Sequence, residues 1–501
     1  MDQFLYSLPA VFTFNNVLAM LISTLSGIII GALPGLSASM GVALLIPFTF
    51  AMEPLTGLLC MAGMYNGAIY GGSIAAILLN IPGTPASVVT ALDGNAMARA
   101  GKPRYALEIA VISSFVGGVM SALSLMLIAP HLAKFALQFG PAESFWVAVL
   151  GLSTIASFIS GSVLKGLLSA CIGLLISVVG VDQITGSHRF TFDNIFLMEG
   201  FAQVVVLIGL FSIPEVVAML QEAASGQKIG GETITMTKND EDKWRIKKDL
   251  KPSLFSWLRS SIYGIIVGMI PGAGANIAAF LSYNSEKKAS KTPELFGKGS
   301  PEGVRAAEAA NNAVTASAMI PMLTFGIPGN AVTAIMVGGL LIHGLHPGPN
   351  LFMKEPDIVY GLMWGMFLTN FAMLFFGYTG SPWFAKCLKI PTILLAGGIM
   401  VLSAIGAYAI NNSLFDIGVM FGFGLLGILM KKVGIPVAPA VLGIILGPIA
   451  ESELRRALLL ADTPLELITR PLSAAIVAII ILSLMYPILK TWFLNKRRQA
   501  S

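Results

Sequence analysis

The chain has 501 residues, of which 55% are hydrophobic and only 11% are charged, and its mean hydropathy is +0.80. A soluble protein of this size could not keep so much apolar surface in water, so the composition excludes a soluble protein and indicates an integral membrane protein. The net charge of +5 comes from Lys and Arg gathered in a few loops, which indicates membrane topology rather than a surface for nucleic acid.

The apolar segments predict the fold class. Each approaches the roughly 20 residues that a helix needs to cross about 30 Å of hydrocarbon. With the Gly-rich segments between them, they predict an all-α polytopic membrane protein of about twelve membrane segments, several of them short or broken. The N-terminus has no basic region before its first apolar run, so we expect no cleavable signal peptide. The long apolar stretches lie at residues 11–32, 106–130, 143–160, 162–180, 201–220, 357–379, 390–410, 413–431 and 471–493.

One segment of the sequence occurs twice. Residues 27–39 read Gly-Ile-Ile-Ile-Gly-Ala-Leu-Pro-Gly-Leu-Ser-Ala-Ser, and residues 264–276 read Gly-Ile-Ile-Val-Gly-Met-Ile-Pro-Gly-Ala-Gly-Ala-Asn, at a constant offset of 237 positions. A second motif follows each copy, Asn-Ile-Pro-Gly-Thr at 80–84 and Gly-Ile-Pro-Gly-Asn at 326–330, at an offset of 246. Two blocks in the same order, with nine extra residues in the second copy, indicate an internal duplication.

The duplication predicts the domain organisation. We expect a first membrane repeat over residues 1–220 and a second over 253–501, which ends in the basic cytoplasmic tail Lys496-Arg497-Arg498. Residues 221–252 are rich in Lys, Asp and Glu and are predicted to form a charged cytoplasmic linker between the repeats.

The basic loops predict that the two repeats face opposite ways. In the first repeat the basic loop follows the second motif, at 99–104, whereas in the second repeat it lies between the two motifs, at 287–298. The corresponding loops, at 53–54 and 343–346, contain no Lys or Arg. Because Lys and Arg concentrate on the cytoplasmic side, we predict inverted repeats with both basic loops inside and the other two loops outside.

The Pro-Gly pairs predict breaks in the membrane helices. Pro removes a backbone hydrogen bond and Gly frees the backbone, and polar groups released at membrane depth are costly unless protein, water or ligand satisfies them. Such breaks suit a cavity, where helix N-termini can hold an anion. Single Pro and Gly residues are common in membrane helices, but the repetition of these sites with polar residues after them favours a binding centre. The predicted substrate-binding residues are Pro34, Gly35, Ser37, Ser39, Pro82, Gly83, Thr84, Pro271, Gly272, Asn276, Pro328, Gly329 and Asn330.

The same breaks free backbone carbonyls that can coordinate a cation beside the anion. For Asn66 and Asn312, which are separated by the second offset, hydrogen bonding to a neighbouring helix is an equally open alternative to ion binding. The Gly-xxx-Gly pairs at 27–31 and 264–268 precede the breaks and are interpreted as close-packing seams. The predicted Na⁺ ligands are these carbonyls with Asn66, Asn312, Thr333 and Ser87.

Ionisable residues within the predicted spans are few. Arg305 and Glu308 stand at i and i+3 and are interpreted as an ion pair on a helix surface near the cytoplasmic end, although Arg305 could also meet an anionic substrate on its way in. No His-Glu-x-x-His, Gly-x-Ser-x-Gly or phosphate-binding Gly-Lys-Ser/Thr motif appears, so we expect neither an enzyme nor a cofactor. Without a nucleotide site, transport by this chain would draw on an ion gradient or on another subunit.

The motif residues resemble those of a known family. The segments at 31–41, 80–87, 268–276 and 325–330 are similar to motifs of the large membrane subunit (TctA family) of the bacterial tripartite tricarboxylate transporters, and the similarity covers essentially the whole chain. The resemblance implies a sodium-coupled symporter of the bacterial inner membrane. It also implies two partners, a small membrane subunit and a periplasmic solute-binding protein that delivers the carboxylate.

We therefore expect Na⁺-coupled uptake of citrate-like tricarboxylates or related carboxylates. We further expect that the duplicated broken segments form one mobile unit, as in an elevator, which moves against a scaffold of longer helices. The alternatives are a carboxylate or anion channel without ion coupling, and a membrane scaffold in which the duplication is purely architectural. No residue in the sequence separates one carboxylate from another, and the sequence leaves a dimer open.

Overall fold

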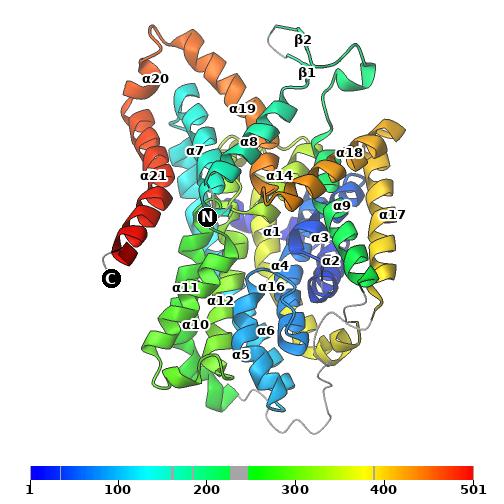
Figure 1. Cartoon of the computed structure of the whole chain (residues 1–501), viewed down its shortest axis with the longest axis vertical. Helices are drawn as coiled ribbons and strands as arrows, with labels where there is room; N and C mark the ends of the chain where they lie inside the picture. The colour runs from blue at the N-terminus through cyan, green and yellow to red at the C-terminus, as the bar shows by residue number, and fades with distance from the viewer. Residues whose placement is uncertain are drawn as a thin grey trace.

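The protein is described by a computed structural model, which covers residues 2–33, 35–159, 163–182, 185–225, 246–387 and 390–499. The described chain is almost entirely helical, and its one small sheet is an antiparallel hairpin of β1 (Gly180–Val181) and β2 (His188–Arg189). Figure 1 shows the hairpin at one end of the molecule, whereas the lower ends of the helices α5, α10 and α11 lie at the other. This confirms the predicted all-α class.

The first half of the chain contains the helices before the linker. They are α1 (Asp2–Val11), α2 (Phe14–Ala32), α3 (Ala38–Thr49), α4 (Pro54–Leu79), α5 (Ser87–Arg99), α6 (Pro103–Ala136), α7 (Pro141–Ile159), α8 (Val163–Ser177), the short η1 (Ile195–Leu197) and α9 (Gln203–Ala224). Residues 226–245, which make up most of the predicted linker, lie outside the described residues.

The second half of the chain contains the helices after the linker. Its helices are α10 (Ile246–Met269), α11 (Gly274–Ala289), η2 (Pro293–Leu295), α12 (Pro301–Ser317), α13 (Met319–Phe325), α14 (Ala331–Ile342), α15 (Leu351–Lys354), α16 (Pro356–Cys387), α17 (Thr392–Asn411), α18 (Leu414–Lys432), α19 (Ala438–Leu460), α20 (Glu466–Thr469) and α21 (Pro471–Gln499).

The lengths and compositions of these helices fit a membrane protein. In the described chain, seven helices are long and apolar enough to cross a membrane, namely α2, α4, α6, α9, α16, α17 and α18 over at least 18 residues each. Four shorter apolar helices, within α3, α8, α14 and α21, accompany them. The polytopic class is therefore confirmed, and the predicted total of about twelve crossings holds only approximately because several helices are short. The window of α4 is entirely buried, so α4 stands at the centre of the protein.

The predicted breaks occur in both copies, and their backbones match. Gly35, between α2 and α3, has φ +84°, and its counterpart Gly272, between α10 and α11, has φ +79°. Asn80 ends α4 with φ +59°, and its counterpart Gly326 ends α13 with φ +73°. Left-handed backbone is uncommon outside Gly and Asn, so its recurrence at both offsets is direct evidence of the duplication. Pro34, predicted to start the first break, lies outside the described residues.

The Gly-xxx-Gly pairs pack α2 on α4 and α10 on α12. A Cβ atom added to Gly31 would lie 2.1 Å from the carbonyl oxygen of Ala68, and one added to Gly264 would lie 2.5 Å from that of Ala310. Neither site has room for a side chain. The structure therefore confirms these glycines as close-packing seams.

The contacts between the halves show that the repeats are inverted. The α3–α4 loop lies beside the end of α14, where His343 Nε2 would be 2.6 Å from a Cβ added to Gly57. The α11–α12 loop lies beside the end of α5, where the backbone N–H groups of Gly297 and Gly299 donate to Asp93 at 2.8 Å. The loop between the motifs in each copy thus adjoins the end of the second motif in the other copy. Copies that faced the same way would place equivalent loops together, so the predicted inversion is supported by geometry.

Candidate functional site

The second motif of each copy contains a turn that leads into the following helix, here called the tip (Gly83–Ser87 and Gly329–Thr333). The two tips pack in the same way on the long buried helices α4 and α12. In the first copy the Gly83 N–H donates to the Gly72 carbonyl of α4 at 3.3 Å, and in the second copy the Gly329 N–H donates to the Ala318 carbonyl, after α12, at 3.2 Å. Gly72 and Ala318 are themselves separated by the offset of 246. Each tip is therefore fixed to the long helix of its own repeat by one equivalent backbone hydrogen bond.

A hydroxyl group closes each tip at the start of the following helix. The Ser87 hydroxyl accepts from the Thr84 N–H at 3.2 Å and donates to the Thr84 carbonyl at 2.7 Å. The Thr333 hydroxyl accepts from the Asn330 N–H and donates to the Asn330 carbonyl, each at 3.0 Å. Both residues are predicted from sequence as Na⁺ ligands. Thr333 belongs to a capping box at the N-terminus of α14, whereas Ser87 closes the turn that leads into α5.

The tips differ in how their side chains are paired. In the second copy the Asn330 side chain donates to the hydroxyl oxygen of Tyr65, on α4, at 2.7 Å. The counterparts of these residues at the offset of 246 are Thr84 and Asn311. The Thr84 hydroxyl and both polar atoms of the Asn311 amide are buried and have no hydrogen-bond partner among the described residues. Buried polar groups are rarely left unpaired, so this half of the site is open to a polar ligand or water.

The first motifs lie next to these tips. A Cβ atom added to Gly83 would lie 2.2 Å from the Gly31 carbonyl oxygen, and the Gly272 N–H donates to the Gly329 carbonyl at 2.8 Å. On α4, Gly72 and Tyr65 are two turns apart, which separates the two tips by about 10 Å along the helix. The structure therefore brings all four breaks to the middle of the protein as two neighbouring tips.

The remaining predicted substrate residues occupy different environments. Ser37 caps α3 by accepting from the Met40 N–H at 3.2 Å, and its hydroxyl oxygen lies 3.4 Å from that of Ser39. Pro328 is buried, Pro271 is half-buried, and Pro82 and Asn276 are exposed. The role of these four positions in substrate binding stays a prediction.

The two predicted asparagine ligands of Na⁺ are buried on the central helices. The Asn66 side chain donates to the Met366 carbonyl at 3.2 Å and to the Thr369 hydroxyl at 2.7 Å, which is the alternative of bonding to a neighbouring helix, here α16. Its Oδ1 atom and that of Asn312 have no partner in the described chain. Each therefore keeps one free carbonyl oxygen that can accept a hydrogen bond or bind a cation.

The interpretation of Arg305 and Glu308 as a surface ion pair is wrong. Both residues are buried, and Glu308 is completely so. Its carboxylate accepts hydrogen bonds from the hydroxyl groups of Ser73, Thr90 and Ser114, which belong to α4, α5 and α6. The sequence suggested a surface pair because α12 begins at a charged loop, but α12 packs against α4, α5, α6, α10 and α11 and has no exposed face.

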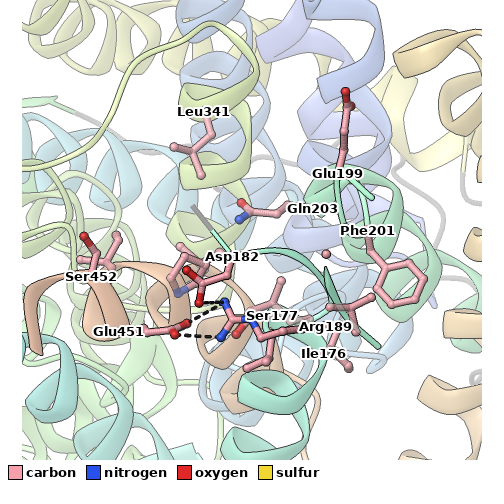
Figure 2. A pocket seen from close by; sticks show the side chains of 18 of the residues that line it. Ile176, Ser177, Asp182, Arg189, Glu199, Phe201, Gln203, Leu341, Glu451 and Ser452 are labelled. Atoms are coloured by element: carbon pink, nitrogen blue, oxygen red, sulfur yellow. Dashed lines mark hydrogen bonds and ion pairs between the residues drawn. The ribbon is translucent and has the colours of Figure 1, made fainter. Parts of the chain in front are cut away.

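A cavity of about 640 Å³ lies at the end of the molecule that carries β1 and β2. Arg189 of β2 makes ion pairs with Glu451 at 2.8 Å and with Asp182 at 3.3 Å, as Figure 2 shows. The hydrogen bond to Glu451 raises the pKa of Arg189 above its ordinary value, so its guanidinium stays charged. His346 of the loop that is predicted to lie outside also lines this cavity.

Two groups of residues at the site are not among the site residues predicted from the sequence. Tyr65 and Asn311 are separated by the offset of 246 and stand beside the predicted asparagines, so the repeat itself carried a signal for them. Ser73, Thr90 and Ser114 carried none, because a single hydroxyl residue in an apolar helix usually bonds its own backbone.

The fold and the site together define a class of protein. Inverted repeats with paired broken helices, buried in a bundle of apolar helices, are typical of a multi-pass membrane transporter.

Comparisons with known proteins give the family. The sequence profile of the Tripartite tricarboxylate transporter TctA family matches residues 17–442, and the chain belongs to this family. Its members are multi-pass proteins of the inner membrane, as predicted.

Two curated relatives come from Agrobacterium vitis. The chain is 38% identical over 465 residues to an uncharacterized 52.8 kDa protein in the TAR-I ttuC' 3' region, covering 93% of this chain and 91% of that protein. It is 36% identical over 217 residues to an uncharacterized protein in the TAR-II ttuC' 3' region, covering 43% and 90%. Among solved structures, the transmembrane domain of the cyanobacterium bicarbonate transporter BicA is similar at 14% identity, with a TM-score of 0.22 over 84% of this chain and 98% of that one. That score is too low to support an argument.

Proposed function

We propose that the protein is a secondary active transporter that takes up tricarboxylates, such as citrate, or related carboxylates together with Na⁺. It receives the substrate from a periplasmic solute-binding protein and works with a small membrane subunit. Membership of the TctA family supports the tripartite arrangement. The observation that carries the proposal is the pair of tips, Gly83 to Ser87 and Gly329 to Thr333, each closed by a hydroxyl group, together with the buried, unpaired polar groups of Thr84 and Asn311.

The tips offer the groups that a carboxylate requires. The helices α5 and α14 begin directly after the tips, and the free N–H groups and the dipole of a helix N-terminus favour an anion. The Thr84 hydroxyl and the Asn311 amide can donate hydrogen bonds to carboxylate oxygens. These groups are preorganised in the folded chain, which lowers the cost of holding the substrate.

Movement of the tips would carry the substrate across the membrane. The broken segments pack on α4 and α12, while α9 packs on α17 and α18 and α19 packs on α7 and α8. In the proposed elevator the first group moves as one unit against the second. Inversion gives the unit two related end states, one open to each side.

Uptake into proteoliposomes tests the proposal. The vesicles contain this chain with its small membrane subunit, are supplied with the binding protein, and receive labelled citrate or another carboxylate with or without an inward Na⁺ gradient. We expect uptake only when both Na⁺ and the binding protein are present. Uptake that ignores both and follows membrane potential alone would instead identify an anion channel.

A further inference from the structure

Glu308 of α12 is a buried carboxylate without a cationic partner. Its side chain is fully buried, and within the described residues no Lys, Arg or His pairs with it. An unpaired charge in the interior of a membrane protein is costly, and ionisable residues there are commonly functional. Something other than a protein cation must therefore balance this carboxylate when it is charged.

Three hydroxyl groups surround the carboxylate. Ser73 donates to Oε1 at 2.6 Å, Thr90 donates to the same oxygen, and Ser114 donates to Oε2 at 2.8 Å. A hydroxyl group has one hydrogen and two lone pairs, so each can rotate and present a lone pair to an ion beside the carboxylate. The cluster thus supplies oxygen ligands from four different helices.

More oxygen ligands lie one turn further along α12. Asn312 follows Glu308 by four residues on the same helix face and donates to the Glu308 backbone carbonyl at 3.4 Å. Its Oδ1 atom is buried and unpartnered in the described chain. An environment of oxygen atoms with a single negative charge suits a hard monovalent cation rather than a transition metal.

We propose that Glu308, with Ser73, Thr90 and Ser114, binds Na⁺. This inference rests on the proposed function, in which it places the coupling ion. The proposed ligands differ from the four that the sequence predicts. Two of the predicted ligands stand nearby in sequence on the same helices, since Asn312 follows Glu308 by four residues and Ser87 precedes Thr90 by three. In this proposal the ion lies between α12 and the helices α4, α5 and α6, and not at the tips themselves.

The position of the cluster explains how ion and substrate would be coupled. The carboxylate belongs to the second repeat, whereas all three hydroxyl groups belong to the first. Thr90 lies six residues after Thr84 on the segment that forms the first tip. An ion that binds α12 to α4, α5 and α6 therefore orders the start of α5, and substrate bound at the tip then meets a helix N-terminus that is already in place.

Equilibrium binding tests the site without transport. The purified full chain with its small subunit is titrated with ²²Na⁺ in choline chloride at constant ionic strength, and thermal unfolding is followed in parallel. We expect Na⁺ to bind and to raise the unfolding temperature of the wild-type protein. Glu308→Gln should lose both effects, and Ser114→Ala and Thr90→Val should each weaken Na⁺ binding about tenfold or more.

A matched control is available in α7. Glu143 is also buried, and it accepts from Ser473 at 3.0 Å and lies 3.9 Å from Arg470, which balances its charge. Glu143→Gln should therefore leave Na⁺ binding unchanged. If Glu308→Gln fails to fold, the two hydroxyl variants, which keep the carboxylate, decide the question.

The outcomes separate this inference from the proposed function. Glu308→Gln with wild-type Na⁺ binding would overturn the inference while Na⁺-dependent uptake stands. A wild-type protein that responds to pH but not to Na⁺ would also overturn it, because Glu308 would then bind a proton. Na⁺ binding that is lost in Glu308→Gln, beside uptake that ignores Na⁺, would support the site and refute the coupled function.

Discussion

Gly35 and Gly272 adopt the same left-handed backbone at corresponding positions of the two copies, with φ +84° and +79°. A β-branched residue is strongly disfavoured there, so the break can form only with Gly or at high cost. We expect Gly35→Val or Gly272→Val to abolish carboxylate uptake while the protein remains in the membrane, as measured in vesicles with matched protein content. Gly418→Val is the control, because a Cβ atom added to this exposed glycine meets nothing within 4 Å. Full uptake by either break variant would remove the first motif from the site.

A substitution at Thr84 tests substrate binding directly. Its hydroxyl has no hydrogen-bond partner among the described residues, so removing it breaks no bond within the described structure. If the hydroxyl binds substrate, Thr84→Val should raise the KM for uptake about two- to tenfold, the usual value of one hydrogen bond. The unfolding temperature should hardly change. Thr49→Val is a buried control, because its hydroxyl donates to the Ile46 carbonyl at the end of α3 that is farther from the first break. An unchanged KM in Thr84→Val would place the substrate elsewhere.

His343 gives the outer face a dependence on pH. Burial against the α3–α4 loop lowers its pKa below the ordinary value of 6.5, so the folded state favours the neutral ring. The unfolded chain then binds more protons between the two pKa values, and stability falls as the pH drops below about 6.5 towards the folded pKa. We expect the unfolding temperature to decrease between pH 7.5 and pH 5.5, and His343→Gln to decrease less. An equal decrease in both proteins would contradict this role.

The breaks and the burial of Glu308 differ in how far they could be predicted from the sequence. The breaks at Gly35, Gly83, Gly272 and Gly329 were predictable, because Pro and Gly act on their own backbone wherever they stand. The burial of Glu308 was not, because spacing within one helix says nothing about which helices surround it. Its three hydroxyl partners lie between 194 and 235 residues away in sequence.

At the scale of elements, the tips depend on the absence of side chains. A Cβ atom added to Gly83 would lie 2.2 Å from the Gly31 carbonyl oxygen, and one added to Gly329 would lie 2.7 Å from that of Ala318. Backbone atoms cannot move aside as a flexible side chain can. We expect Gly83→Ala and Gly329→Ala to lower the unfolding temperature of the purified protein and to reduce uptake. Gly398→Ala, which meets nothing within 4 Å, should do neither.

The lengths of the helices explain why the number of membrane crossings could be predicted only approximately from the sequence. The long helices α2, α4, α6, α9, α16, α17 and α18 follow from apolar length alone. The short helices α3 and α14 begin directly after breaks, and their length depends on what they pack against rather than on a full crossing. For this reason the sequence predicted the class of fold well and the number of crossings only roughly.

At the scale of the whole molecule, inversion assigns each loop to one side. Single cysteines placed at the exposed positions Glu53 and Lys291, with Cys60, Cys171 and Cys387 replaced by Ala, test this assignment. A membrane-impermeant maleimide added to intact cells should label position 53, and it should label position 291 only after the inner membrane is opened. Equal labelling of both positions in intact cells would be incompatible with inverted repeats.

Tyr65 and Asn330 form a hydrogen bond, whereas their counterparts Asn311 and Thr84 do not. This difference affects the relative free energies of the inward-facing and outward-facing forms. In a transporter made of two identical inverted halves, a two-fold rotation about an axis in the membrane plane would exchange the inward-facing and outward-facing forms, and the two forms would have equal free energies. A hydrogen bond between the halves whose symmetry-related counterpart is absent removes that equality. The gradients still fix the direction of net flow, but the resting protein has a preferred side before any substrate arrives.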